Sequence, residues 1–416
     1  MNKNKSLWKK SKRIILKGNS LLSKNPENYS KDWPAYFDKA KGCFIWSIDK
    51  KKYTDFSYMG IGTNILGYSN SKIDNHVKKI ISKGTMSTLN CIEEVKLSEK
   101  LIKMHKWSSM CKFTRTGAEA SAVAIRIGRI NSKKNKIAIC GYHGWHDWYL
   151  SVNLNGKKKL DTHLSKNLNI EGVDKNLKNS TVSFNHNDLV SFKKVVTKNK
   201  DIGVVIMEVE RFEEVNIDFL KFIRNYTKKN NITLIFDECT SGFRQTYGGL
   251  HLKHKINPDI CILGKALGNG YPINAVIGSK QVMEKANNSF ISSTFWSDRV
   301  GPAAALKTLE IMEKDKTWLK LKKLGDYFKY RFKLILNNHN IKGDIVGTGS
   351  LLQFKIDKLS DNELKKFLAT EMLKKNILAS NVIYLSVAHN KTLLEKYFFY
   401  LDKILLNFKK NLKTKS

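Results

Sequence analysis

The sequence predicts an α/β fold built on a mainly parallel, buried sheet. Four short apolar runs rich in β-branched residues are typical of strands covered on both faces: 136–140, 202–207, 232–236 and 260–263. Helix-compatible stretches, such as 217–229, separate some of these runs. This alternation favours parallel strands, because a parallel connection needs a long crossover that is usually a helix.

Polar side chains follow each of the four runs. In chain order they are Tyr142 and His143, then Glu208, then Asp237 and Glu238, and finally Lys265. Core packing alone does not predict polar residues at all four ends. Open α/β sheets bind ligands just outside the carboxyl ends of their strands. We therefore expect an aromatic ring, carboxylates and a lysine to line one crevice.

Lys265 lies among small residues, with Gly268 and Gly270 permitting a tight turn before Pro272. A lysine that forms a Schiff base must be held near its carbonyl partner and must lose its proton, which burial promotes. An isolated lysine is nearly always a solvated surface group. The polar residues that follow the other three runs favour the interpretation of Lys265 as a Schiff-base lysine.

Asp237 suits a cofactor that contains a pyridine ring. Pyridoxal 5′-phosphate (PLP) works best as an electron sink when its ring nitrogen stays protonated, and a nearby carboxylate ensures this. An acid at a strand end can also simply cap the following helix. Beside Lys265, the catalytic interpretation of Asp237 is favoured.

A phosphate site is expected where Thr114, Thr116, Gly117 and Ala118 precede an apolar-periodic, alanine-rich stretch. This pattern is typical of a helix N-terminus, where free N–H groups and the helix dipole attract anions. Taken alone, such a segment is more often an ordinary helix cap. If PLP is the cofactor, its phosphate is the anion that this helix N-terminus would bind.

Tyr142 is flanked by glycine and follows a predicted strand, so its ring is expected to stack on the flat face of the cofactor. His143 and His146 have a spacing that is compatible with a metal site. No third ligand cluster accompanies the pair, so we predict that no metal is bound.

The composition has a strongly basic balance, with a formal net charge of +37. A basic surface is the electrostatic signature of nucleic-acid binders, which makes a non-enzymatic binder the rival class. The lysines are, however, spread over the whole length, and only 5 residues are proline, a bias that a coding sequence poor in G and C can produce. We expect a solvated enzyme surface, with neither nucleic acid nor membrane as partner.

The chain of 416 residues is long enough for two domains, or for one large α/β domain with an appendage. Its lysine-rich start lacks the features of a signal peptide, and no run of eighteen apolar residues occurs. The six cysteines are scattered without a C-x-x-C pair and are expected to be free thiols. These features predict a cytoplasmic enzyme.

Taken together, the chain resembles the class-III aminotransferases, and within them the glutamate-1-semialdehyde aminomutases. The resemblance runs from about Trp33 to Glu313. It rests on an ordered set of motifs: AKGCFIWSIDKKKYTDF, ILGYSN, RTGAEASAVAIRIGR, YHGWHD, VVIMEVE, IFDECTSGFR, NPDICILGKALGNGYPINAVIG and the more divergent STFWSDRVGPAAALKTLE.

The resemblance implies PLP fold type I, with a large domain around a seven-stranded sheet and a smaller α+β domain from both chain ends. We expect residues 1–75 and 306–416 to form the small domain and residues 76–305 the large one. It also implies a homodimer whose active sites lie at the subunit interface.

The same resemblance assigns expected roles to individual residues. Lys265 matches the Schiff-base lysine and Asp237 the acid at the pyridine nitrogen. The other matches are Thr116, Gly117 and Ala118 for the phosphate loop, Tyr142 and His143 for the stacking aromatic and its neighbour, Glu208 for the acid near the ring, and Ser293 and Thr294 for a segment reaching the phosphate from the partner subunit.

Several departures bear on the substrate. The loop after Glu208 is short and lacks the usual glycine and proline residues. Ser23 stands where the aminomutases have an arginine expected to hold a substrate carboxylate, although Lys24 is adjacent. Arg115 replaces the customary asparagine of the phosphate loop, and residues 297–302 depart from the usual pattern.

We therefore predict a PLP-dependent aminotransferase that moves an amino group between an amino donor and a carbonyl acceptor. In this interpretation Lys265 also moves the proton between the substrate α-carbon and the cofactor. The missing arginine argues against glutamate-1-semialdehyde and leaves a sugar-derived or small aldehyde or ketone as the expected acceptor. An aminomutase is the alternative, with Lys24 or Arg115 as carboxylate clamp, and lyase or racemase chemistry is more distant.

Overall fold

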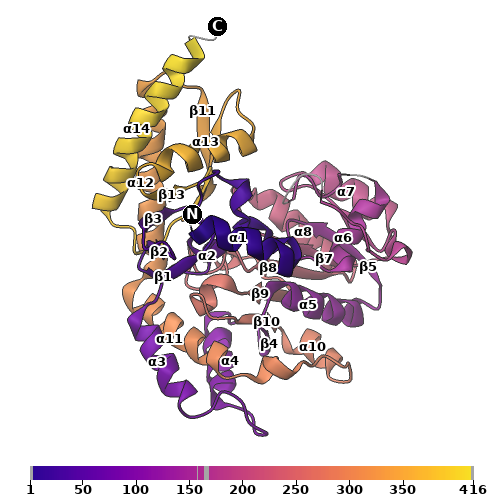
Figure 1. Cartoon of the computed structure of the whole chain (residues 1–416). Coiled ribbons are helices and arrows are strands. Elements are labelled where there is room, and N and C mark those ends of the chain that lie inside the picture. Colours follow the sequence, from indigo (N-terminus) through magenta and orange to yellow (C-terminus); the bar gives the residue numbers. More distant parts are fainter. Residues whose placement is uncertain (1–2, 157, 164–167, 414–416) are drawn as a thin grey trace. The chain divides into compact units, whose positions relative to one another are not determined.

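The computed structural model describes residues 3–156, 158–163 and 168–413, with side chains described as far as residue 409 (Figure 1). The chain forms two compact units. The larger unit comprises residues 75–314, and the smaller unit combines the segment before residue 75 with the segment from residue 315 onward.

The larger unit is built on a seven-stranded sheet in the order β4-β10-β9-β8-β7-β5-β6. The strands are β4 (Met110–Thr114), β5 (Lys136–Cys140), β6 (Thr181–Ser183), β7 (Ile202–Met207), β8 (Thr233–Glu238), β9 (Ile260–Leu263) and β10 (Asn274–Gly278). Neighbours from β9 to β6 pair in parallel, whereas β10 is antiparallel to both β4 and β9. The predicted mainly parallel α/β sheet is confirmed.

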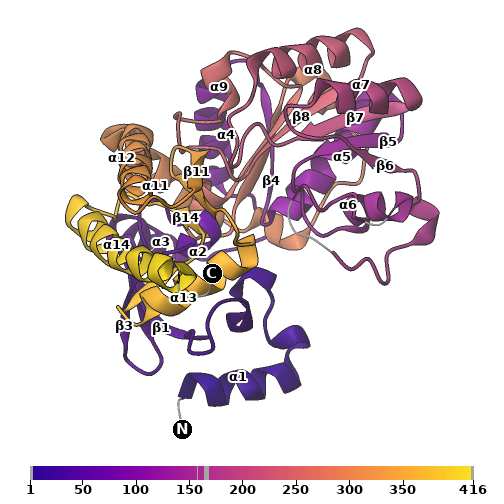
Figure 2. The ribbon, with the colours of Figure 1, turned by 90° about the horizontal axis from the view of Figure 1, so that it is seen from above.

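Helices cover both faces of this sheet, which explains why its central strands are apolar on both sides. Ile137 and Ile139 of β5 pack in the core under α5 (Gly117–Ser132). The alternate residues, Ala138 and Cys140, pack in the core beneath α7 (Leu189–Lys198) and α8 (Ile217–Lys229). Figure 2 shows α7 and α8 along one face and α5 on the opposite face.

Shorter helices and turns complete the larger unit. They include α3 (Ser71–Ile81), which begins just before the unit boundary, α4 (Ile92–Met104), α6 (Asp147–Leu150), α9 (His251–His254), α10 (Lys280–Met283), α11 (Val300–Asp315) and the 3₁₀ turns η6 (Lys265–Gly268) and η8 (Thr294–Ser297). Asn269, just after η6, is left-handed (φ 44°) and Gly270 has φ 104°, so the chain reverses tightly after Lys265.

The smaller unit draws on both chain ends. Its first sheet, β1-β2-β3-β13, joins β1 (Phe37–Lys41), β2 (Phe44–Ser47) and β3 (Lys52–Phe56) to β13 (Ile377–Ala379). Its second sheet contains β11 (Gly343–Thr348), β12 (Leu351–Ile356) and β14 (Val382–Tyr384). The helices are α1 (Lys3–Ile14), α2 (Met59–Gly62), α12 (Thr317–Asn338), α13 (Asp361–Leu373) and α14 (Lys391–Lys413).

The parallel pairing of β13 with β3 links the C-terminal and N-terminal segments within one sheet, which confirms the expected small α+β domain from both chain ends. An aromatic cluster of Phe328, Phe332, Phe354, Tyr397 and Phe398 fills its core. No helix in the described part of the chain combines the length and apolar composition needed to span a bilayer.

Candidate active site

The carboxyl ends of β5, β7, β8 and β9 meet at one edge of the sheet, because these strands are parallel. Direct hydrogen bonds connect the residues that follow them. The ring Nδ1 of His143 lies 2.9 Å from Asp237 Oδ2, and the Tyr142 amide donates to Glu208 Oε2 at 3.0 Å. The structure thus brings together residues that the sequence placed in one crevice.

Lys265 is partly buried and donates from Nζ to the Thr240 hydroxyl at 2.6 Å. Burial is the main cause that lowers the pKa of Lys265 to about 8, and the positive charge of Arg211 lowers it further. The backbone just before Lys265 is closely packed, because a Cβ atom on Gly264 would lie 1.9 Å from Asn274 Oδ1. A lysine so placed reaches its neutral form far more readily than a surface lysine.

Asp237 is only 5% exposed. Burial raises its pKa, but the hydrogen bond and charge of His143 and the Cys239 amide, which donates at 3.1 Å, outweigh burial, so the pKa of Asp237 is lowered. His143 Nε2 faces the Cys140 carbonyl at 3.2 Å. The two ring nitrogens of His143 therefore face one carboxylate and one carbonyl. The site therefore holds a buried aspartate in its ionised form.

Glu208 forms an ion pair with Arg211, a residue that no motif in the sequence indicates as part of the site. Glu208 Oε1 accepts from Arg211 Nη2 at 2.6 Å and from Nε at 3.1 Å. Arg211 Nη2 also lies 3.5 Å from the Thr240 hydroxyl, and the guanidinium carbon lies 5.8 Å from the centroid of the Tyr142 ring. The signal that could have found Arg211 is its place in the loop that begins where β7 ends.

The start of α5 carries a capping box. Thr116 Oγ1 accepts from the Glu119 amide at 3.3 Å, while the Glu119 carboxylate accepts from the Thr116 amide at 2.8 Å. The N–H groups of Gly117 and Ala118 belong to the first turn, where the helix itself offers no acceptor.

Two close approaches position this helix start beside the strand ends. A Cβ on Gly117 would lie 3.4 Å from Cys239 Sγ, and a Cβ on Gly144 would lie 2.7 Å from the Ala118 side chain. Gly144 also has φ +113°, a conformation that favours glycine. The first turn of α5 therefore lies between the segment after Asp237 and the loop after Tyr142.

Ser293 and Thr294 are exposed and lie at the start of η8. Among the hydrogen bonds of the described residues, none joins either of them to Lys265 or Asp237. Arg115 anchors the same segment, because its guanidinium donates to the Trp296 carbonyl at 3.0 Å and to the Asp298 carbonyl. Arg115 is thus engaged with backbone carbonyls.

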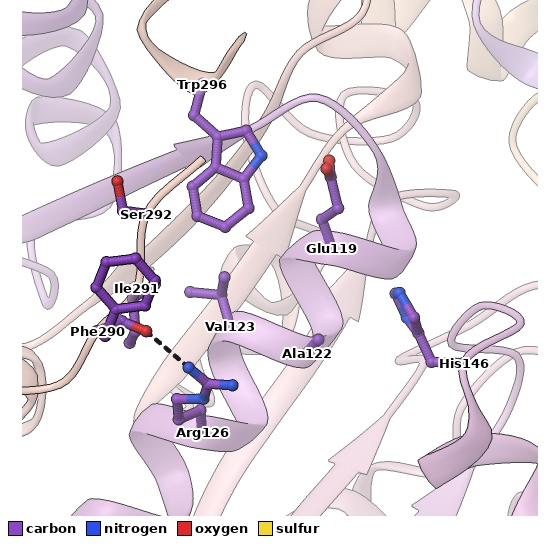
Figure 3. A pocket seen from close by; sticks show the side chains of 9 residues that line it. All are labelled: Glu119, Ala122, Val123, Arg126, His146, Phe290, Ile291, Ser292 and Trp296. Atoms are coloured by element: carbon purple, nitrogen blue, oxygen red, sulfur yellow. Dashed lines mark hydrogen bonds between the residues drawn. The ribbon is translucent and has the colours of Figure 1, made fainter. Parts of the chain in front are cut away.

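A cavity of about 320 Å³ adjoins the first turns of α5 (Figure 3). Its lining consists of Glu119, Ala122, Val123, Arg126, His146, Phe290, Ile291, Ser292 and Trp296. Arg126 closes part of its wall by donating to the Phe290 carbonyl at 2.7 Å, as Figure 3 shows. Neither Lys265 nor Asp237 is among the residues that line this cavity.

Glu238, His251 and Cys261 offer three possible metal-ligand atoms within 4.8 Å of one another. The His251 ring is already engaged on both sides. Its Nδ1 lies 2.6 Å from Glu238 Oε1, and its Nε2 accepts from Trp107 Nε1 at 2.9 Å. The Glu238 and His251 side chains thus belong to a hydrogen-bond network of the core.

The sequence profile described as Aminotransferase class-III matches residues 27–393 of the chain. The chain belongs to the class-III aminotransferase family. Curated relatives of this aminotransferase include the 3-aminobutyryl-CoA aminotransferase of Cloacimonas acidaminovorans, 32% identical over 75% of this chain and 73% of that protein. Another is the glutamate-1-semialdehyde 2,1-aminomutase of Nitrosopumilus maritimus, 32% identical over 94% of this chain and 96% of the relative.

Solved structures share the fold of this aminotransferase. The FumI protein of Sphingopyxis sp. MTA144, solved in its PLP internal aldimine form, matches with a TM-score of 0.87 at 22% identity, over 99% of this chain and 97% of that one. An omega-transaminase from Sphaerobacter thermophilus matches with a TM-score of 0.85 at 21% identity, over 98% of both chains. The expected PLP fold type I is confirmed.

The residues of this aminotransferase fit the PLP that the family uses. The cofactor needs an amine that can lose its proton, an anion for its ring nitrogen and donors for its phosphate. Lys265, with its lowered pKa, meets the first need, and the ionised Asp237 meets the second. The first-turn N–H groups of α5 supply donors for an anion.

Proposed function

We propose that this class-III aminotransferase transfers an amino group to a carbonyl acceptor other than glutamate-1-semialdehyde, and that a sugar-derived or other small ketone or aldehyde is the acceptor. The observation that carries this proposal is the state of Arg115. Its guanidinium is bound to the carbonyls of Trp296 and Asp298, so it is not available as the carboxylate clamp of an aminomutase. Ser23 stands at the position of the arginine that would serve this role.

We propose that Lys265 holds PLP covalently and then moves the proton between the substrate α-carbon and the cofactor C4′. When bound there, PLP would supply an electron sink for this proton transfer. The lowered pKa of Lys265 supports this role, because the neutral amine is the form that accepts a proton. The Thr240 hydroxyl, 2.6 Å from Nζ, supports it further by orienting the amine.

We assign the other roles from the same geometry. Asp237 is proposed to keep the pyridine nitrogen protonated, with His143 as the group that holds its carboxylate in place. Tyr142 is proposed to stack on the ring, near the acid Glu208, whose carboxylate accepts from the Tyr142 amide. Residues 116–118 are proposed to bind the phosphate through the first turn of α5.

We propose that the protein acts as a homodimer in which Ser293 and Thr294 reach the phosphate of the partner subunit. Phe290 and Phe295, which flank this segment, are 84% and 68% exposed. Large exposed apolar side chains beside a cavity are typical of interaction surfaces. A cytoplasmic location is proposed as well, supported by six cysteines that are all free.

An aminomutase remains the second candidate, because the aminomutase of Nitrosopumilus maritimus aligns with 94% of the chain. Direct assay separates the two. We expect amino donors to convert the bound cofactor to its amine form, with one keto acid formed per site, and a carbonyl acceptor to restore it. Efficient conversion of glutamate-1-semialdehyde to 5-aminolevulinate by the purified protein would overturn the proposal.

A further inference from the structure

The loop of residues 208–216, between β7 and α8, carries a buried carboxylate with hydrogen-bond partners from separate segments. Glu210 is only 1% exposed. Its Oε1 accepts from the Val215 amide at 3.2 Å and faces His254 Nε2 at 3.3 Å. Its Oε2 accepts from Gln245 Nε2 at 3.1 Å. Glu210 therefore connects the start of the loop to the end of the loop, to the segment after β8 and to α9.

Special backbone geometry does not set the path of this loop. None of the residues 208–216 is glycine or proline, and none has a positive φ. Contacts hold the loop instead. Val209 and Val215 are buried in the core that also contains residues of α8. Glu210, next to Val209, adds hydrogen bonds, which are directional where apolar packing is not.

The carboxylate of Glu210 is held in its ionised form. Burial raises its pKa, but the hydrogen bonds from His254, the Val215 amide and Gln245 outweigh burial, so the pKa of Glu210 is lowered. A buried charge is tolerated only where partners satisfy it, and its removal leaves the donors without an acceptor. Neutralising Glu210 should therefore loosen the loop.

The next residue in the loop, Arg211, reaches the strand-end site. Its Nη2 lies 3.5 Å from the Thr240 hydroxyl, which accepts from Lys265 Nζ at 2.6 Å. The guanidinium nitrogen thus lies within about 6 Å of the amine. Glu208 is held separately, because its carboxylate accepts from the Tyr142 amide. The place of Arg211 therefore depends on how the loop is held beyond Glu208.

We propose that Glu210 is a positioning residue, which holds the loop of residues 208–216 and thereby keeps the guanidinium of Arg211 beside Thr240 and Lys265. This role rests on the proposed function, in which Lys265 is the reacting amine. Glu210 acts only through Arg211, since its own hydrogen bonds run to Val215, Gln245 and His254.

The amine of Lys265 reports the place of Arg211. Burial is the main cause that lowers the pKa of Lys265, and Arg211 lowers it further, whereas Cys239, Glu208 and Asp237 raise it. When the loop loosens, the arginine moves away and the acidic neighbours remain. The pKa of Lys265 should then rise.

The test uses the full chain freed of cofactor, so that the Lys265 amine is read directly. Trace labelling with acetic anhydride between about pH 6 and about pH 10, quantified by mass spectrometry, gives the half-labelling pH of this amine. Hydrogen exchange of the Val215 amide reports how firmly the loop is held. For Glu210→Gln we expect this exchange to be at least about tenfold faster and the half-labelling pH to rise by about 0.5 to 1 pH unit.

Two control variants carry the same substitution. Glu214→Gln changes the same loop, but its side chain is 72% exposed and pairs with Lys253 at 3.3 Å. It should leave both readouts unchanged, because an exposed ion pair contributes little. Glu238→Gln removes a buried carboxylate that faces His251. It should lower Tm but move the half-labelling pH of Lys265 by less than about 0.2 pH unit.

An unchanged half-labelling pH in Glu210→Gln, or an equal rise in Glu238→Gln, would overturn the inference. Gln245→Leu protects the test if Glu210→Gln does not fold, because it removes one partner and keeps the carboxylate. It should give a smaller rise, and no rise would likewise overturn the inference. If the wild type transfers no amino group while the rise is seen, the proposed function fails and the positioning role of Glu210 stands.

Discussion

Two consecutive carboxylates at the end of β8 differ in how many hydrogen bonds they accept. Asp237 and Glu238 are both buried, and both face a histidine, His143 and His251 respectively. Asp237 accepts two hydrogen bonds among those found for the described residues, from His143 and from the Cys239 amide. An ionised carboxylate offers about four acceptor positions.

Glu238, by contrast, accepts four hydrogen bonds. It accepts from the His251 amide at 2.9 Å, from the His251 ring at 2.6 Å, from the Ser241 hydroxyl at 3.2 Å and from the Leu250 amide. Alternation along the strand turns the two side chains to opposite faces. The comparison teaches that a buried acid beside a histidine is not by itself a catalytic signal: acceptor capacity and the neighbouring lysine distinguish Asp237 from Glu238.

Removal of the lysine should have the largest effect. In Lys265→Ala we expect turnover to fall by at least about 10⁴-fold, because covalent attachment and proton transfer are lost together. The visible absorbance of the bound cofactor should lose its borohydride-reducible component. A variant that retains a reducible lysine adduct would show that another lysine carries the cofactor.

Asp237→Ala should weaken the chemistry more than the binding. Without the carboxylate the ring nitrogen loses its proton more easily and the electron sink is poorer, so we expect kcat to fall roughly 10²- to 10³-fold. Some cofactor should still bind, as absorbance and equilibrium dialysis would show. Near-normal turnover would remove Asp237 from the catalytic site.

Glu238→Gln is the counterpart that sharpens the comparison. Loss of one partner from a buried charged network typically costs about 3 kcal/mol of unfolding free energy. We expect a lowered Tm, while kcat per folded, cofactor-loaded site stays within about threefold of the wild type. A loss of kcat as large as that of Asp237→Ala would erase the distinction between the two acids.

A change of pH should alter the rate less than any of these substitutions. Since burial and Arg211 lower the pKa of Lys265 to about 8, the neutral amine becomes its main form only above that pH. The rate of the half-reaction with an amino donor should therefore rise severalfold from pH 7 to 9 and then level off. Stopped-flow absorbance measures it, and a rate that falls across this range would contradict the assignment of Lys265 as base.

Much of the larger unit could be predicted from local pattern. The runs 136–140, 202–207 and 260–263 coincide with β5, β7 and β9, and the stretch 217–229 with α8. The apolar run 232–236 predicts a strand that ends too soon. The observed strand β8 continues through Asp237 and Glu238, which pair with β9 although they are polar. The apolar pattern marks only the part of the strand that packs in the core, whereas Asp237 and Glu238 are buried as well but are bonded to histidines.

Other features depend on contacts that sequence spacing does not reveal. The antiparallel strand β10 separates β4 from β9, a pairing between segments more than 150 residues apart. Arg211 and Thr240 enter the site through loops whose path is set by tertiary packing. The domain limits and the roles of the site residues stay predictions, and those of Ser293 and Thr294 also require a second subunit.

Covalent labelling of the wild-type protein tests the central claim most directly. The PLP-bound enzyme would be reduced with borohydride and digested, and the peptide that carries the cofactor identified by mass spectrometry. The strand-end site predicts one labelled position per chain, Lys265, in the segment between β9 and β10. Label on any other lysine, or no stable label after reduction, would contradict it.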